Sequence, residues 1–167
     1  MKTRLFALGL WLMAFTCQVS AQDLKMQDVF RQMPASLLPT LSENNRLDML
    51  DFMDSKMKAE VKNRLGGTSE MTALTDSTLT IRMSNALQVD MLLLKTTENA
   101  DADGEVICLI ETFGTDSLSL ESKVRFFTPS WQLLKEPPQL SVSDQNTISS
   151  TRMQTILKRD GEILKKN

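Results

Sequence analysis

Residues 87–112 read LQVDMLLLKTTENADADGEVICLIET, and this stretch decides the fold. Two apolar runs, residues 87–95 and 105–112, flank a polar loop that ends in Gly104. The side chains of each run alternate with the two-residue period of a β-strand. Both alternating sets are largely apolar, which is typical of a central strand covered on both faces. The stretch therefore predicts an antiparallel pair of strands at the heart of one domain.

The segments before this pair predict helices first and strands afterwards. The first helix has approximately helical spacing of apolar residues and ends at Pro34. Ser42 begins a second helix with a broader apolar face, and from Lys56 onward apolar and polar residues alternate as in a strand. The expected segments are helices over residues 24–33 and 42–55, strands over 57–65 and 79–83, and a short strand or turn over 71–74.

The segments after the pair predict one more strand and a less regular tail. Residues 123–128 alternate as a strand, and residues 131–134 are expected to fold back against it after the turn at Pro129. In the tail, Leu140 and Val142 are compatible with a further edge strand. Residues 143–150 are polar and predict a loop, whereas residues 151–159 predict a helix.

Helices that precede a series of strands favour the α+β class over alternating α/β. We therefore expect two N-terminal helices packed on an antiparallel meander sheet of about five to seven strands, with a short C-terminal helix. The side chains expected in the core are Leu47, Leu50, Phe52 or Met53, Val89, Met91, Val106, Cys108, Ile110, Phe126 and Trp131.

The first 21 residues have the pattern of an export signal. Lys2 and Arg4 give a basic start, an apolar run follows, and small residues precede Ala21. This pattern predicts a signal peptide over residues 1–21, cleaved after Ala21, and a single domain over residues 22–167 in the periplasm or outside the cell. The apolar run is short for a bilayer span, and no later stretch approaches about 18 apolar residues, so no transmembrane segment is expected in the mature chain.

Cys17 offers an alternative, because it could be the lipid-bearing cysteine of a lipoprotein signal. Such cleavage prefers small residues before the cysteine, and Phe15 and Thr16 fit that preference poorly. The signal-peptide interpretation is therefore favoured over a lipoprotein.

Composition excludes several classes of function. Loss of Lys2 and Arg4 with the signal leaves 17 basic residues against 21 acidic ones, and nucleic-acid binding needs a surplus of clustered Lys and Arg. Only Cys108 remains in the mature chain, so no internal disulfide is expected. The chain has no histidine, which removes the commonest general base near neutral pH and the commonest transition-metal ligand.

The polar loop contains the sharpest local motif of the chain. Residues 99–104, NADADG, resemble the first half of a calcium-binding loop, in which oxygens at alternate positions surround the ion. The second half does not fit, because Ile110 occupies the position of the final acidic ligand and the following residues alternate as a strand. A solvated loop is favoured, with weak calcium binding by Asp101 and Asp103 as the alternative.

Other candidate residues have structural interpretations that are favoured over functional ones. Asp48 and Asp51 could act as paired carboxylates, but their spacing places them on the polar side of a helix. Cys108 lies within an apolar strand and lacks a histidine to activate it. The scattered methionines fit core positions better than a copper site, and the basic residues 158–166 fit a solvated helix better than a docking site.

The aromatic residues of the mature chain are concentrated near the end of the last strand. Phe126 and Phe127 point to opposite faces of a strand, so one of them would lie under a helix or be exposed. An exposed phenylalanine beside Trp131 would form a contact patch. Burial of both rings is the favoured interpretation.

Two further segments carry a family resemblance. MPASLLPTLSENNRLD, which begins at Met33, and FFTPSW, which ends at Trp131, resemble a domain-of-unknown-function family of small exported proteins from Bacteroidales. The likeness covers residues 33–134. Because the resemblance implies no assigned activity, it transfers no catalytic or binding residue to this chain.

These observations favour an exported, non-catalytic module of the periplasm or cell envelope that binds a protein or an envelope component. The alternative is a carboxylate-dependent hydrolase whose site forms only in the fold, which predicts an acidic cleft with a raised carboxylate pKa. A calcium-stabilised structural protein is a third class. The sequence assigns no catalytic, cofactor-binding or metal-binding residue, and no cofactor is expected.

Overall fold

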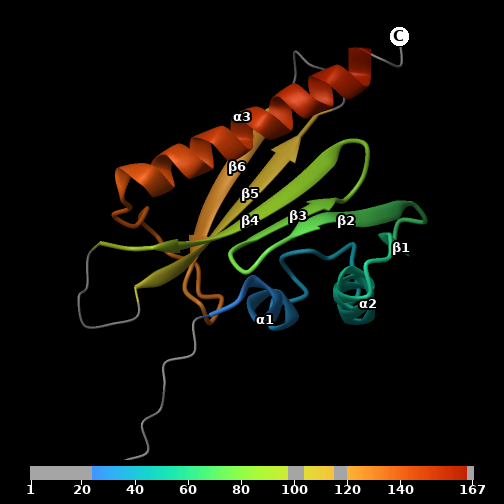
Figure 1. Ribbon diagram of the computed structural model, residues 1–167, viewed down its shortest axis with the longest axis horizontal. Helices are drawn as coiled ribbons and strands as arrows, with labels where there is room; N and C mark the ends of the chain where they lie inside the picture. The colour runs from blue at the N-terminus through green and yellow to red at the C-terminus, as the bar shows by residue number, and fades with distance from the viewer. Residues whose placement is uncertain (1–23, 98–103, 115–119, 165–167) are drawn as a thin grey trace, which may run out of the picture.

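The computed structural model describes residues 24–97, 104–114 and 120–164. Within these residues the chain forms a six-stranded antiparallel sheet in which every strand pairs with the next along the sequence (Figure 1). The predicted meander is therefore confirmed. The strands are β1 (Ala59–Lys62), β2 (Thr68–Leu74), β3 (Thr78–Arg82), β4 (Leu87–Lys95), β5 (Glu105–Phe113) and β6 (Glu121–Phe127).

Three helices in the described part of the chain cover the two faces of the sheet. The helices are α1 (Met26–Arg31), α2 (Glu43–Asp54) and α3 (Val142–Leu164). Figure 1 shows α1 and α2 on one side of the sheet and α3 running obliquely across the other. The side chains of α1 and α2 belong to the main apolar core, and a second apolar cluster lies on the α3 side. The predicted α+β class is confirmed.

The central pair is buried on both faces, as its two-sided apolar pattern predicts. Leu92 lies opposite Cys108 in the β4–β5 register, and both side chains belong to the cluster on the α3 side. Their neighbours Met91 and Leu109 also pair, and both belong to the main core. Alternation along the two strands thus supplies each of the two cores with a row of side chains.

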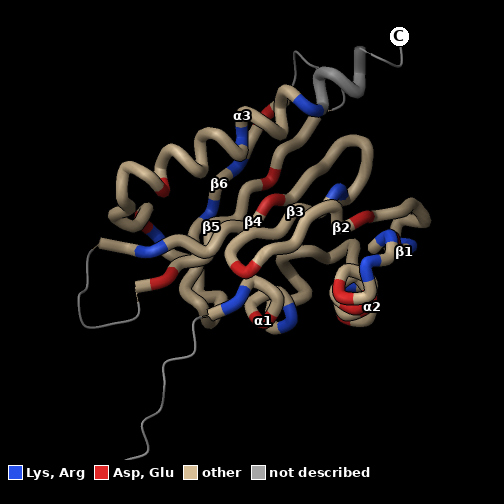
Figure 2. Tube along the Cα trace, in the orientation of Figure 1, with Lys and Arg blue, Asp and Glu red and all other residues tan. Residues whose placement is uncertain are grey.

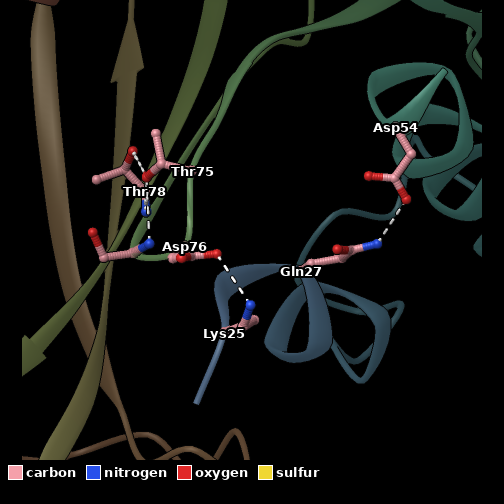
Figure 3. Close-up of polar contacts among 7 residues, drawn as sticks. Lys25, Gln27, Asp54, Thr75, Asp76 and Thr78 are labelled. Carbon is pink, nitrogen blue, oxygen red and sulfur yellow. Dashed lines mark hydrogen bonds and ion pairs between the residues drawn. The ribbon is translucent and has the colours of Figure 1, made fainter. Parts of the chain in front are cut away.

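Local sequence and tertiary contacts together fix the first two helices. Ser42 caps α2, because its hydroxyl accepts from the Asn45 amide while the Asn45 side chain accepts from the Ser42 amide. The six residues of α1 are too few for a stable isolated helix. Figure 3 shows that Lys25 pairs with Asp76 of the β2–β3 turn at 3.6 Å and Gln27 donates to Asp54 of α2 at 3.1 Å. These exposed contacts add little to the burial of Met26, Val29 and Phe30, which packs α1 on the main core.

The C-terminal helix is confirmed, but its predicted bounds were too narrow. Residues 143–150, predicted as a loop, form the first turns of α3. The Ser141 hydroxyl accepts from the Asp144 amide at 3.1 Å, which satisfies an otherwise free helix donor. This segment is polar because its side chains are mostly exposed, and exposure does not prevent a helix. The predicted edge strand reduces to a single bridge between Leu140 and Thr96, since Val142 already begins α3.

Two strands differ in length from the prediction. The strand predicted over residues 57–65 is limited to Ala59–Lys62, and Met57 and Leu65 at its expected ends are exposed. Residues 71–74, predicted as a short strand or turn, are part of β2. Residues 131–134 fold back on β6 as predicted, because Leu133 forms a bridge with Phe127.

Most of the predicted core is buried, and the exceptions lie on α2 and β6. The predicted residues that are buried are Leu50, Val89, Met91, Val106, Cys108, Ile110 and Trp131. Leu47, Phe52, Met53 and Phe126 are only partly buried.

The predicted burial is confirmed for Phe127 and Trp131, Phe126 is partly buried, and the alternative of an exposed patch that includes Trp131 is wrong. Phe127 and Trp131 are buried in the main core, and their ring centroids lie 5.5 Å apart. Phe126 packs against the apolar cluster on the α3 side. Both rings of the pair are therefore used for packing, one on each face of the sheet.

Candidate binding groove

The face of the sheet toward α3 changes from apolar to polar along β4. Leu94 and Leu92 belong to the apolar cluster on this face, but the next two residues on the same face are Asp90 and Gln88. Gln88 lies opposite Arg82 of β3. The α3 helix therefore covers an apolar surface at one end and a polar surface at the other.

A groove of about 390 Å³ lies where α3 passes over this polar surface. Its sheet side includes Thr72 of β2, Thr80 of β3, and Gln88 and Asp90 of β4. The β2–β3 register shifts between Met71 and Ala73, so Thr72 is the extra residue of a β-bulge. Bulges bend a strand locally and often occur next to functional sites.

The helix side of the groove comes from residues spaced along one face of α3. Thr151, Thr155 and Lys158 are four and three residues apart, which places them on the same side of a helix. Gln154 also lines the groove. The sequence of this helix thus presents two hydroxyls, an amide and an ammonium group to the sheet.

A hydrogen-bonded cluster forms the floor of the groove. Asp90 is 2% exposed, and its Oδ1 accepts from the Thr80 hydroxyl at 2.7 Å. The Thr155 hydroxyl donates to Asp90 Oδ2 at 3.0 Å, which links α3 to the sheet. Gln88 Nε2 lies 3.1 Å from Asp90 Oδ2 and 3.0 Å from Thr155 Oγ1. We call these four residues, Thr80, Gln88, Asp90 and Thr155, the Asp90 cluster.

The rim of the groove has polar groups that the fold does not use. Among the described residues, the side chains of Thr72, Thr151, Gln154 and Lys158 have no hydrogen-bond or ion-pair partner. Thr72, Gln154 and Lys158 are exposed and Thr151 is half-buried. Each of them carries an N–H or O–H donor. The groove therefore combines a fixed floor with free donors at its edge.

Asp48 and Asp51, two of the acidic residues singled out in the sequence, do not line the groove. Asp48 and Asp51 are exposed on α2, as the polar-stripe interpretation predicts. Asp101 and Asp103 lie outside the described residues. Figure 2 shows acidic and basic residues interspersed over the sheet and helices. No group of three or more metal-ligating residues occurs within residues 24–97, 104–114 and 120–164.

Cys108 is a core residue, and the burial of its thiol can be tested by the pH dependence of stability. Its side chain is fully buried, and burial raises the pKa of the thiol from 9.0 to about 12. The folded chain keeps this proton above pH 9 whereas the unfolded chain releases it, so the free energy of unfolding falls as pH rises through this window. We expect this loss to be about 1 kcal/mol between about pH 9 and 10, and to be absent in Cys108→Ala.

Urea unfolding of both proteins across this range measures the difference. Only the slope with pH is compared, because Cys108→Ala also loses packing in the core. Parallel curves for the two proteins would contradict the protonated, buried thiol.

Sequence reasoning missed the Asp90 cluster. In the alternation along residues 87–95, Asp90 shares a face with Leu92. A carboxylate on an otherwise apolar face of a central strand is the signal that could have identified it. The partner Thr155, 65 residues away, had no signal of its own.

A family model described as protein of unknown function DUF3256 matches residues 16–160. The chain belongs to this family. The predicted resemblance is thus confirmed, and the match extends beyond the predicted residues 33–134 into α3.

This DUF3256 chain is also similar to a solved structure of a domain of an uncharacterized protein from Porphyromonas gingivalis W83. The TM-score is 0.51 and the sequence identity 24%, over 65% of this chain and 52% of that chain. This likeness shows a shared fold, and the chain spans about half the length of the solved one. Curated proteins gave no match.

Within the described residues, no helix of the DUF3256 chain has both the length and the apolar content needed to cross a membrane.

Proposed function

We propose that this DUF3256 chain is an exported, non-catalytic binding module of the periplasm or cell envelope, and that the groove under α3 is its binding site. The observation that carries the proposal is the pairing of a floor fixed by hydrogen bonds with free donors at the rim. Binding sites of this kind are usually preformed and have few convergent polar groups. The expected partner is a protein or an envelope component.

The state of the reactive groups supports binding over catalysis. Both oxygens of Asp90 already accept hydrogen bonds from side chains of the fold. Cys108 is buried, and its raised pKa keeps the thiol in its unreactive protonated form. Both groups are thus engaged within the fold. Export is supported by the pattern of residues 1–21.

A variant in which a large side chain obstructs the groove is expected to bind its partner more weakly. Thr151→Trp places a large side chain at the lining of the groove, so capture of envelope components by the immobilised protein should fall by about tenfold or more. Ser149→Trp is the matched control, because Ser149 is exposed on α3 and does not line the groove. Quantitative mass spectrometry of the captured material compares the variants.

Equal capture by the two variants and the unaltered protein would refute the groove as the binding site. Equal loss in both variants, with a lowered melting temperature, would also speak against it, because damage to α3 would then explain the result.

Export is tested by the mass of the mature chain and by the cell fraction that contains it. Intact mass spectrometry of the protein isolated from cell fractions is expected to give a chain that begins at Gln22, in the periplasmic or the secreted fraction. A chain that begins at Cys17 with the added mass of lipid would show a lipoprotein instead. Recovery of the full chain in the cytoplasm would contradict export.

A carboxylate-dependent hydrolase is the second candidate, and one observation favours it: Asp90 is a carboxylate on the floor of a groove. This function predicts turnover of a panel of ester, amide and glycoside substrates. Activity should disappear in Asp90→Asn and persist in Asp48→Asn, because Asp48 is exposed on α2. Absence of turnover by the folded protein would dispose of this candidate.

A further inference from the structure

The Asp90 carboxylate is buried and has no positive partner among the described side chains. It is 2% exposed, and none of the ion pairs among the described residues includes it. Burial of a charge is unfavourable unless the charge is paired or well hydrogen-bonded. The donors in the Asp90 cluster provide part of this compensation. A positive group from a ligand would provide the rest.

The Asp90 cluster has more acceptors than hydrogens to fill them. Gln88 Nε2 carries two hydrogens but lies within 3.2 Å of three acceptors, the two carboxylate oxygens of Asp90 and the hydroxyl of Thr155. The hydroxyls of Thr80 and Thr155 use their hydrogens on Asp90. What this floor can offer a ligand is therefore acceptor capacity beside a negative charge. An ammonium group, with three donors and a positive charge, matches it best.

The rim has the opposite character. Lys158 is exposed, lines the groove and has no ion-pair partner among the described residues. It is three residues beyond Thr155, which is about 4.5 Å along the helix axis. The residue that carries the positive charge therefore lies just under one helical turn along α3 from Thr155, which donates to Asp90. A carboxylate is the natural partner for the Lys158 ammonium.

We infer that the groove binds a small zwitterionic ligand, an amino acid or a short peptide, with its ammonium group on the Asp90 cluster and its carboxylate at Lys158. This inference rests on the proposed function, because it names the ligand class of the same groove. The volume of about 390 Å³ is near the lower end for small-molecule sites, which suits a ligand of this size.

Four probes separate the parts of this inference. Glycylglycine carries both charges, N-acetylglycylglycine lacks the ammonium group, and glycylglycinamide lacks the carboxylate. Free glycine distinguishes an amino-acid site from a peptide site. Calorimetric titration of the purified protein is expected to show glycylglycine or glycine binding about tenfold more tightly than either neutralised analogue.

Two variants assign each end of the ligand. Lys158→Gln should weaken glycylglycine about tenfold and leave glycylglycinamide unchanged, because the amide has no carboxylate to lose. Lys135→Gln is its matched control, since Lys135 is also exposed and does not line the groove. Asp90→Asn should abolish the preference for glycylglycine over its acetylated form. Thermal melts establish that each variant is folded. If Asp90→Asn does not fold, Lys158→Gln still tests the inference, because Lys158 is exposed and its replacement should not disturb the fold.

The ligand class is overturned if both neutralised analogues bind as tightly as glycylglycine, or if no probe binds at millimolar concentration. The proposed function fails separately. Failure of the probes together with loss of envelope capture in Thr151→Trp would reject the zwitterion and keep the groove as a binding site. Failure of the probes with unchanged capture in Thr151→Trp would reject both.

Discussion

Replacement of Trp131 by alanine is expected to destabilise the protein by about 3–5 kcal/mol, the range for large aromatic side chains removed from a core. Trp131 is 8% exposed and packs on Phe127. Its Nε1–H donates to the Val29 carbonyl of α1 at 3.0 Å, so one side chain connects the end of β6 with the first helix. Its loss leaves a cavity and a carbonyl without its donor.

The backbone at this position supports the same expectation. Trp131 has a φ of 64°, a left-handed conformation that bulky residues rarely adopt. The turn needs it, because the Trp131 amide donates to Thr128 at 2.8 Å before the chain reverses. The packing of the indole outweighs this local strain. Reduced capture of a partner by Trp131→Ala would therefore report lost stability and would not locate a contact surface.

Urea unfolding followed by circular dichroism measures the effect. Trp131→Phe keeps most of the buried area and loses the hydrogen bond, so its cost should be about 1–2 kcal/mol. Leu133→Ala is the control within the same segment, because Leu133 is exposed and should change the stability by about 0.5 kcal/mol or less. A cost below about 1 kcal/mol for Trp131→Ala would contradict this account.

Replacement of Arg46 by methionine is expected to cost about 2–4 kcal/mol, although methionine is the more apolar residue. Arg46 lies on α2, is 4% exposed, and donates to the carbonyls of Phe30 and Met33 at the end of α1. Its guanidinium also lies 5.9 Å from the centre of the Phe30 ring. Phe30 lies in the last turn of α1, where its carbonyl also accepts from the Met33 amide, and Met33 lies just beyond the helix. Arg46 thus supplies donors from another helix to the C-terminal end of α1.

Burial lowers the pKa of the Arg46 guanidinium, with Glu43 acting in the opposite direction, but arginine stays protonated at ordinary pH. The effect of the substitution should therefore not depend on pH near neutrality. Arg64→Met is the matched control, because exposed Arg64 also donates to a carbonyl, that of Pro39 at 3.3 Å. Its cost should be below about 1 kcal/mol. Equal costs in urea unfolding would contradict a special role for the buried arginine.

The elements that were predicted correctly are those whose own residues specify the structure. β4 and β5 alternate on two apolar faces, and Ser42 has the side chain that an N-cap requires. The first turns of α3 were missed because residues 143–150 are polar and exposed, and periodicity identifies a helix only through its apolar face. The burial of Arg46 was not predicted for a related reason, because a charged residue on a helix is usually exposed.

The groove could be predicted only in part from the sequence pattern. Alternation with Leu92 is sufficient to place Asp90 on the face toward α3. It does not show that Thr80 and Thr155 will donate to the carboxylate, because one comes from the neighbouring strand and the other from a helix far along the chain. The free side chains at the rim are also defined only by what the fold places near them.

The amino-acid sequence by itself determined the class of fold, the central strand pair and the family, because alternation, capping residues and local motifs act over a few neighbouring residues. Only the tertiary structure decided that α3 crosses the polar end of β4 and leaves a groove there. The physical reason is that hydrogen bonds such as the one from Thr155 to Asp90 join residues distant in sequence, and neither residue type specifies its partner.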